Sequence, residues 1–245
     1  NLKVNHGKYI DWTALRFASV NKYIKIVKLL LNAKADINAI DNDGVSLLMS
    51  ATLRGNPEII ELLIKSGANV NAGNGRVLKI ASSFDGNLEI VKLLIENGAD
   101  VKKYGGPALL EAAKYRQVKI ARLLIKNGAD VNYMRDILDG PIIIQALTFG
   151  SMEMIELLVA SGAKINARGK ALKTVLMYAI EYRNIEVIHL LIKKRADVNL
   201  VDAEGATALD YITSSGDNTK KIEILRILKA AGARRGTGVP AIGPN

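Results

Sequence analysis

The sequence predicts an all-α fold, a solenoid in which helix–turn–helix units stack one after another. Three observations predict it. A short block recurs along the 245 residues, each recurrence has room for two amphipathic helices, and 49% of residues are apolar while only 5% are aromatic. A fixed period is typical of repeat proteins, in which each unit buries its apolar face against its neighbours. The aliphatic composition favours helices packed on helices.

The recurring block is an alanine, a polar residue and an aliphatic residue, followed by asparagine in most copies. Its alanines are Ala35, Ala68, Ala99, Ala129, Ala163 and Ala196. Successive copies are therefore 33, 31, 30, 34 and 33 residues apart. Chance does not produce such a series, so the repeat is the strongest feature of the chain.

The first helix of each unit is predicted from an alanine with an aliphatic residue three positions before it. The pairs are Leu15/Ala18, Leu48/Ala51, Leu78/Ala81, Leu109/Ala112, Ile143/Ala146 and Leu176/Ala179. A spacing of three places both side chains on one helical face. Alanine there lets the neighbouring repeat approach closely. Phe17, Ile80 and Tyr178, one residue before the alanine, are assigned to the core.

The second helix has a wide apolar stripe, as in the stretch 58–64. Glycine follows it at Gly67, Gly98, Gly128 and Gly162, where a left-handed residue ends a helix well. Lys34 and Arg195 stand at this place in the first and sixth repeats, which predicts caps that are strained or built differently. Pro57 and Pro107 are expected in the first turn of a helix.

A unit of about 33 residues with these features resembles the ankyrin repeat. The family's Thr-Pro-Leu-His start survives in part at Thr13-Ala14-Leu15-Arg16, Ser46-Leu47-Leu48-Met49, Thr174-Val175-Leu176-Met177 and Thr207-Ala208-Leu209-Asp210. The resemblance implies an ankyrin-repeat solenoid of stacked helix–turn–helix units with β-turn fingers. Two fingers are about three residues short, and we expect shortened hairpins at Asn74-Gly75 and Gly105-Gly106.

The resemblance covers almost the whole chain and predicts one repeat domain at 1–235, followed by a flexible tail at 236–245. Residues 1–7 have the register of the end of a preceding repeat, so we expect the chain to be a fragment of a longer protein. The repeats are expected at about 8–40, 41–73, 74–104, 105–134, 135–168, 169–201 and 202–234.

Composition argues against an enzyme. The chain has no cysteine and two histidines, His6 and His189, which leaves little for thiol, metal or acid–base chemistry. Phosphate-loop, zinc-helix, nucleophile-elbow and dinucleotide-binding patterns are all missing from the sequence. We therefore expect no catalytic residues, no bound metal and no cofactor. The lack of cysteine favours a reducing compartment, the cytoplasm of the protein's own cell or that of a host.

The resemblance implies that a partner binds to the fingers and to the ends of the first helices. Three residues past the first-helix alanine, four consecutive repeats carry a ring: Phe84, Tyr115, Phe149 and Tyr182. At about 10 Å per repeat the rings would span about 30 Å, enough for about nine extended residues. The other interpretation is that the rings only cover the gaps between first helices. The candidate contacts are Arg54, Phe84, Tyr104, Lys114, Tyr115, Arg116, Tyr133, Met134, Phe149, Tyr182 and Arg183, with Tyr104, Tyr133 and Met134 placed at finger bases.

These features predict a non-enzymatic protein-interaction module, monomeric, whose partner is another protein with an acidic or apolar extended segment. The net charge of +10 leaves open binding of nucleic acid or of an acidic surface through basic patches. No basic helix or glycine-rich RNA loop supports the nucleic-acid alternative. A third possibility is that the repeats are the targeting or regulatory segment of a larger enzyme or of a secreted effector.

Overall fold

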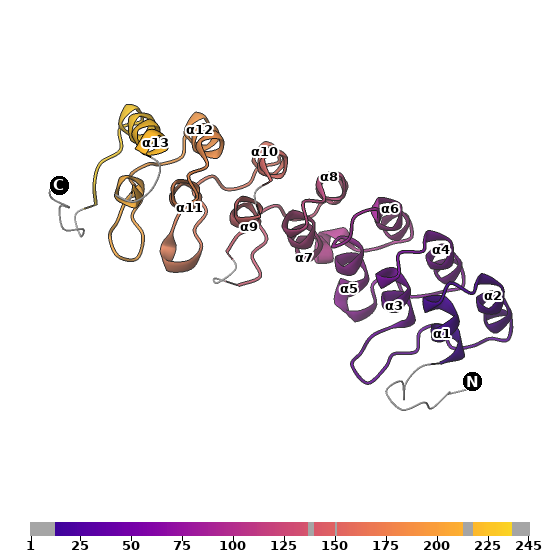
Figure 1. Ribbon diagram of the computed structural model, residues 1–245. Helices are drawn as coiled ribbons and strands as arrows, with labels where there is room; N and C mark the ends of the chain where they lie inside the picture. Colours follow the sequence, from indigo (N-terminus) through magenta and orange to yellow (C-terminus); the bar gives the residue numbers. More distant parts are fainter. Residues whose placement is uncertain (1–12, 137–139, 150, 213–217, 237–245) are drawn as a thin grey trace. The chain divides into compact units, whose positions relative to one another are not determined.

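The computed structural model describes residues 13–136, 140–149, 151–212 and 218–236 (Figure 1). The expected repeat remnant at 1–7, His6 and all but the first residue of the expected tail lie outside these ranges. The α-helices of the described residues are α1 (Ala14–Val20), α2 (Ile24–Asn32), α3 (Leu47–Leu53), α4 (Pro57–Lys65), α5 (Ala72–Ala81), α6 (Leu88–Glu96), α7 (Val101–Lys114), α8 (Val118–Lys126), α9 (Ile142–Thr148), α10 (Met152–Ala160), α11 (Val175–Glu181), α12 (Ile185–Lys193) and α13 (Asn218–Ala230). Two short 3₁₀ helices are η2 (Lys170–Leu172) and η3 (Ala208–Tyr211).

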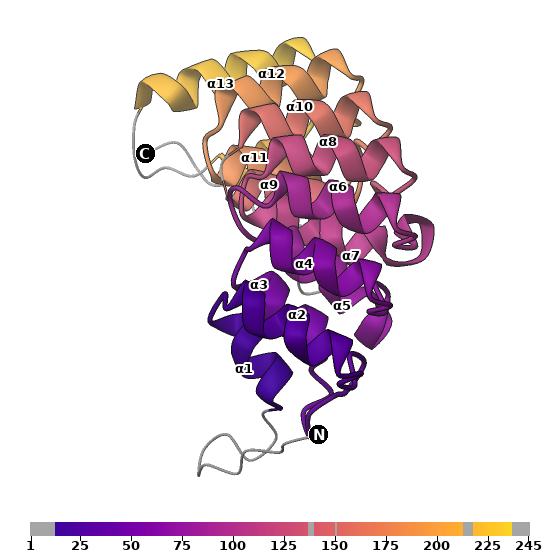
Figure 2. The same ribbon diagram turned by 90° about the vertical axis from the view of Figure 1, so that its right-hand side faces the viewer.

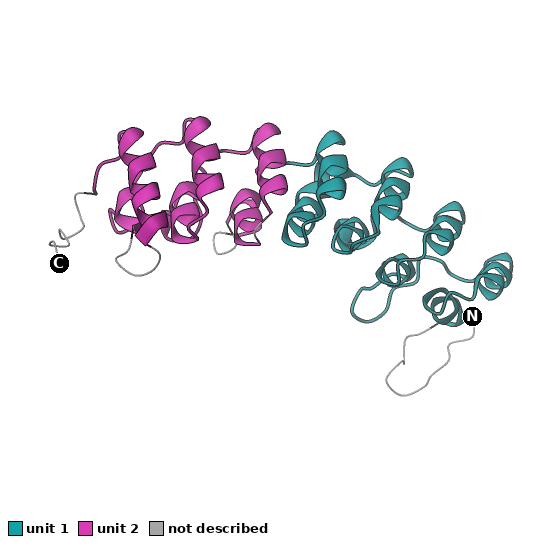
Figure 3. Ribbon diagram, turned by 45° about the horizontal axis from the view of Figure 1, so that its top comes forward, with its two compact units in different colours: residues 1–130 teal, residues 131–245 magenta. Residues whose placement is uncertain are grey.

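The chain forms two compact units, residues 1–130 and 131–245 (Figure 3). In unit 1, the first helices of the repeats (α1, α3, α5 and α7) contact one another in order. The second helices α4, α6 and α8 do the same, and Figure 2 shows α4 and α6 side by side. In unit 2, α9 contacts α11 and α10 contacts α12, while η3 and α13 form the last pair. Each unit is a two-layer stack of helix pairs, which confirms the predicted all-α solenoid.

The core follows the repeated alanine. All six predicted pairs, from Leu15/Ala18 to Leu176/Ala179, are at most 1% exposed. The second helices add aliphatic side chains such as Ile59, Ile60 and Leu63, each of them fully buried. Alanine is needed because the first helices pack directly on one another, and a larger side chain would overpack the contact.

Phe17 is not in the core, against the prediction. Its side chain is 54% exposed, and its ring packs on that of Tyr23 with centroids 6.3 Å apart. Ser50, at the same position of α3 one repeat later, is 7% exposed. Among the described residues α1 has a first-helix neighbour on one side only, so the equivalent face of Phe17 stays open. Ile80 and Tyr178 are half-buried.

The second helices end alike whether or not glycine is present. Gly67 has φ 94°, and Lys34 and Arg195 take φ 56° and 62° at the same place. The sequence left open whether these two caps are strained or built differently. They are strained, because both keep the left-handed conformation. A side chain with a Cβ is strained there by about 1 kcal/mol.

The closing asparagine of a repeat is hydrogen-bonded to the next repeat. Asn38, Asn71, Asn132 and Asn199 each donate from Nδ2 to the carbonyl of the glycine that ends the following second helix. Each also accepts an N–H from two residues beyond that glycine. The third repeat has Lys102 at this register position. The period of about 33 residues is therefore fixed by polar contacts as well as by the core.

The fingers differ from one another. Among the described residues, antiparallel bridges close three of them, at Ile40/Ser46, Met134/Pro141 and Arg168/Thr174. The prediction of a hairpin at Gly105-Gly106 is wrong, because α7 runs without interruption from Val101 to Lys114.

Close packing explains the continuous helix. A Cβ on Gly105 would lie 2.8 Å from the Cβ of Ala129, so the glycine lets α7 approach that residue. Pro107 is consequently inside the helix rather than in its first turn, also against prediction, whereas Pro57 is at the first position of α4 as expected. At Asn74, three consecutive left-handed residues (73–75) replace the expected hairpin and lead into the rest of α5.

Candidate partner-binding surface

The ends of the first helices expose side chains because of how the helices stop. Arg54, Tyr115, Phe149 and Tyr182 are the C-cap residues of α3, α7, α9 and α11. Where the next residue is described, it takes a left-handed conformation: Gly55 (φ 61°), Arg116 (φ 58°) and Arg183 (φ 53°). This turn ends the helix and leaves the C-cap side chain outside the packed layer. The rings of Tyr115, Phe149 and Tyr182 are 56%, 38% and 48% exposed.

Phe84 departs from the predicted register. Helix α5 ends at Ala81 with Ser82 as its C-cap, so Phe84 is two residues beyond the helix end. The hydroxyls of Ser82 and Ser83 donate to the carbonyls of Leu78 and Lys79 at this helix end. The ring is still 45% exposed.

In unit 1 the exposed ring of Tyr115 has charged neighbours. Lys114 is half-buried and Arg116 is exposed. Arg54 and Phe84 are exposed at the ends of two earlier first helices, α3 and α5, of the same unit. These residues offer apolar ring surface next to positive charge.

In unit 2 the ring of Tyr182 is held by its neighbours. The rings of Tyr178 and Tyr182 have centroids 6.4 Å apart, and the Tyr182 hydroxyl lies 3.5 Å from the Thr148 Oγ1. Phe149 follows Thr148 at the end of the adjoining first helix, and the half-buried Arg183 follows Tyr182. Unit 2 therefore presents two exposed rings, and contacts within the unit hold that of Tyr182.

The three residues expected at finger bases have separate environments. Tyr104 is not in a finger but inside α7, half-buried, and it covers Gly75, where an added Cβ would lie 2.3 Å from the Tyr104 Cβ. The expectation fails because the shortened finger is absorbed into the helix. Tyr133 is half-buried. Met134 is in a finger bridge opposite Pro141 and is 45% exposed.

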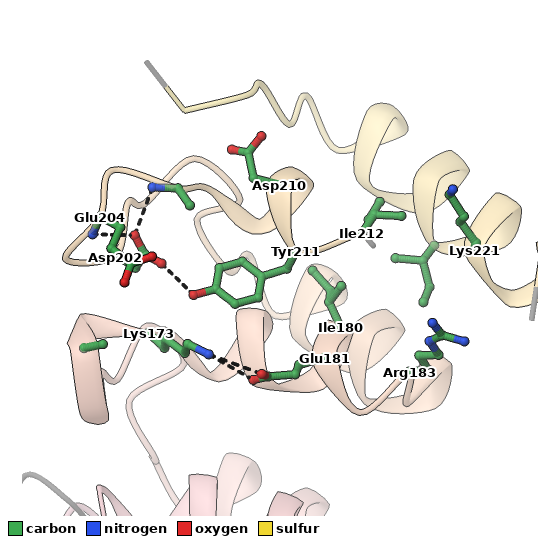
Figure 4. Close-up of a pocket in the computed structure, with 13 residues that line it drawn as sticks. Lys173, Ile180, Glu181, Arg183, Asp202, Glu204, Asp210, Tyr211, Ile212 and Lys221 are labelled. Carbon is green, nitrogen blue, oxygen red and sulfur yellow. Dashed lines mark hydrogen bonds and ion pairs between the residues drawn. The ribbon is translucent and has the colours of Figure 1, made fainter. Parts of the chain in front are cut away.

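A cavity of about 610 Å³ in unit 2 was missed by the sequence analysis (Figure 4). It lies where α11, the finger before it and the last repeat meet. Glu181, Asp202 and Tyr211 line one end together with Lys173, whereas Ile180, Ile212, Arg183 and Lys221 line the other. These residues come from the finger, α11 and the last repeat, and their spacing is not periodic. No sequence motif therefore predicts the cavity.

Hydrogen bonds fix the acidic end of the cavity. The Tyr211 hydroxyl donates to Asp202 Oδ2 at 2.5 Å, and the N–H groups of Glu204 and Ala206 donate to Oδ1. Burial raises the pKa of Asp202, but these donors outweigh it and bring the pKa below its ordinary value. Burial and the Asp202 carboxylate raise the pKa of Tyr211, so the pair is a carboxylate and a neutral phenol.

Nothing in the described ranges points to a metal centre or a membrane segment. Those ranges contain no group of three or more His, Asp or Glu side chains placed to hold an ion. None of their helices is long and apolar enough to cross a bilayer. His189 is exposed on α12.

Comparison with known proteins agrees with the geometry. Ankyrin repeats match residues 1–74, 48–135 and 142–235. The ankyrin repeat domain of Bcl-3, a member of the IkappaB protein family, has a TM-score of 0.74 at 24% identity, over 88% of this chain and 99% of that one. The human ASB11 ankyrin repeat domain has a TM-score of 0.73 at 24% identity, over 94% of this chain and 100% of that one.

A curated relative shares a shorter stretch. The probable E3 ubiquitin-protein ligase XBOS31 of Oryza sativa subsp. japonica is 34% identical over 62 residues. The matched stretch is 25% of this chain and 14% of that protein. The solved structures share the fold, and the repeats themselves match over most of the chain. This chain therefore belongs to the ankyrin repeat family.

Proposed function

We propose that the chain is a non-enzymatic module that binds an extended segment of a partner protein on the ends of its first helices. Ankyrin repeats are generally protein-interaction modules. The observation that carries the proposal here is the set of exposed rings, Phe84 and Tyr115 in unit 1 and Phe149 and Tyr182 in unit 2. Aromatic side chains bury large areas on binding and are enriched, with arginine, among interface residues that dominate affinity.

The ring positions favour binding over a purely structural role. A ring that only filled the gap between two first helices would be mostly buried in the free protein. These four are 38–56% exposed, so much of their surface is left for a partner to cover. Arg116 and Arg183, next to two of the rings, suit a segment that carries acidic as well as apolar residues.

The proposal is tested with Tyr115→Ala and Phe149→Ala, one in each unit. Each variant should lose affinity for the partner while keeping the helical circular dichroism spectrum of the parent. Full binding by both variants would show that the ring surface is not the site.

The match to the rice protein supports a second, broader proposal. The repeats of this chain serve as the recognition segment of a larger protein, and any catalytic activity belongs to another part of it. Mass spectrometry of the native protein tests this directly: a mass near 26.5 kDa, that of this chain, would refute it.

The absence of cysteine supports a reducing compartment, and we place the protein in the cytoplasm.

A further inference from the structure

The ammonium group of Lys173 lies in an environment built to hold a cation. Its Nζ is 3.2 and 3.3 Å from the two carboxylate oxygens of Glu181. It also lies 4.9 Å from the centroid of the Tyr211 ring and 5.8 Å from that of Tyr178. We call Tyr178, Glu181 and Tyr211 the ammonium cage. Two ring faces and one carboxylate around a cation are the chemistry by which proteins recognise ammonium groups.

Contacts other than those of Lys173 hold the two rings of the cage. The Tyr211 hydroxyl donates to Asp202, a carboxylate that is itself held by two backbone N–H groups. This hydrogen bond fixes the ring and increases its electron density. The Tyr178 ring is held by contact with Tyr182, and its hydroxyl lies 3.5 Å from the carbonyl oxygen of Lys170. The two rings would therefore keep their places if the Lys173 side chain left the cage.

Lys173 is carried by a strained finger. Ala171 and Leu172, which directly precede it, both have left-handed backbones with φ 55° and 57°, a conformation that costs L-residues energy. Both side chains are exposed, Leu172 to 50%. The lysine side chain itself is 24% exposed. The ammonium group is held by one salt bridge and two ring contacts at a partly exposed position, where another ammonium group can replace it.

The cavity provides the room for an exchange. Lys173, Glu181 and Tyr211 line it directly, so a side chain that enters the cavity meets two of the three cage residues (Figure 4). The other end of the cavity carries Arg183 and Lys221, which would suit an acidic group. The structure favours the cage end, because there an ammonium group is seen bound.

We propose that the ammonium cage is a binding site for a lysine side chain of the partner, and that Lys173 occupies it until the partner's lysine replaces it. This inference rests on the proposed function and deepens it by naming one residue type of the bound segment. It also makes the Lys173 side chain an internal competitor for that site.

The test uses Lys173→Gln, which empties the cage, and Lys170→Gln, a control in the same finger outside the cage. The probe is an acetylated and amidated pentapeptide, Gly-Ala-Lys-Ala-Gly, followed by NMR. Removing the internal competitor should tighten binding of the peptide by about tenfold relative to the parent, whereas the control should bind as the parent does. Adding Glu181→Gln to Lys173→Gln should abolish the gain.

Three results would overturn the proposal: no gain in Lys173→Gln, an equal gain in the control, or tighter binding of the matched peptide with glutamate in place of lysine. The last result would assign the cavity to acidic side chains at Arg183 and Lys221. Should Lys173→Gln fail to fold, the parent chain is titrated with tetramethylammonium chloride against sodium chloride. We expect the NMR chemical shifts of the Tyr178 and Tyr211 ring protons alone to change and to saturate with tetramethylammonium. The absence of these changes would contradict the proposal.

No partner protein is present in these titrations. If the peptide does not bind the cage, the exposed rings can still be the surface that binds the partner. If Tyr115→Ala and Phe149→Ala leave partner binding intact, the cage can still bind the lysine peptide. The two proposals fail independently.

Discussion

The side-chain amide of Asn71 donates to the carbonyl oxygen of Gly98 at 2.9 Å, joining the end of one repeat to the end of the next second helix. Its Oδ1 accepts the N–H of Asp100, also at 2.9 Å. The same pair of contacts recurs at Asn38, Asn132 and Asn199. One residue type thus satisfies backbone groups that a helix end leaves unpaired.

Replacing Asn71 with alanine should destabilise unit 1 by about 1–2 kcal/mol, because two hydrogen bonds between repeats are lost. The measurement is the urea unfolding midpoint. Asn42→Ala, an exposed residue in a finger, is the control and should change stability by less than about 0.5 kcal/mol. Equal effects of the two substitutions would show that the asparagine contacts add no stability.

Lys34→Gly and Arg195→Gly should each stabilise the protein by about 0.5–1 kcal/mol, since glycine relieves the left-handed strain at φ 56° and 62°. A differential scanning calorimetry trace should show a higher Tm for each variant. The reverse change, Gly67→Ala, should lower it, although nothing lies within 4 Å of the added Cβ. A lower Tm in the glycine variants would contradict the strain argument.

Acid should weaken unit 1 through Asp41, whose Oδ2 lies 2.7 Å from Arg16 Nη1 with both side chains largely buried. Burial raises the pKa of Asp41, but the Val45 N–H and the Arg16 guanidinium outweigh it and hold the pKa below the ordinary 3.8. The stability that this ion pair contributes is therefore complete above pH 3.8 and is lost as the pH falls through the lowered pKa.

The check is the urea midpoint of the parent and of Asp41→Asn between pH 7 and pH 2. The parent should be the more stable at neutral pH, and the difference should shrink only in acid. At pH 7, Arg16→Ala should cost about 3 kcal/mol, because it leaves the Asp41 carboxylate without its partner. A difference in urea midpoint between the parent and Asp41→Asn that does not change with pH would show that the ion pair is not its source.

Replacing Arg116 with glycine should raise the stability of the protein and lower its affinity for the partner. Glycine suits the φ of 58° and should raise stability by about 0.5–1 kcal/mol. Loss of the guanidinium beside Tyr115 should lower affinity for an acidic partner segment. A calorimetric Tm and a partner titration on the same sample test both parts, and unchanged affinity would remove Arg116 from the proposed surface.

The fold could be predicted from the sequence because its determinants are local and periodic. The alanine of each first helix recurs every 30 to 34 residues and is buried in every copy, and glycine follows the second helix in most repeats. The prediction failed where tertiary packing determines the local secondary structure. A Gly-Gly-Pro stretch is a poor helix former, yet it is helical in α7 because Gly105 lets the helix lie against Ala129.

The candidate site could be predicted only in part. Tyr115, Phe149 and Tyr182 are at the helix ends that the register predicts. Phe84 is displaced because α5 ends at Ala81, two residues earlier than the repeat register predicts. The ammonium cage places residues 178, 181 and 211 around Lys173, and its geometry depends on how a finger, a first helix and the last repeat meet.

The most direct test of the central claim is partner capture from cell lysate, with nuclease added, by the parent chain and by a variant with alanine at Phe84, Tyr115, Phe149 and Tyr182. A control variant carries Leu29→Ala and Ile222→Ala, two exposed apolar residues on second helices. We predict a protein that the parent and the control capture and that the four-ring variant does not. Equal capture by all three, or capture that disappears with nuclease, would contradict the claim.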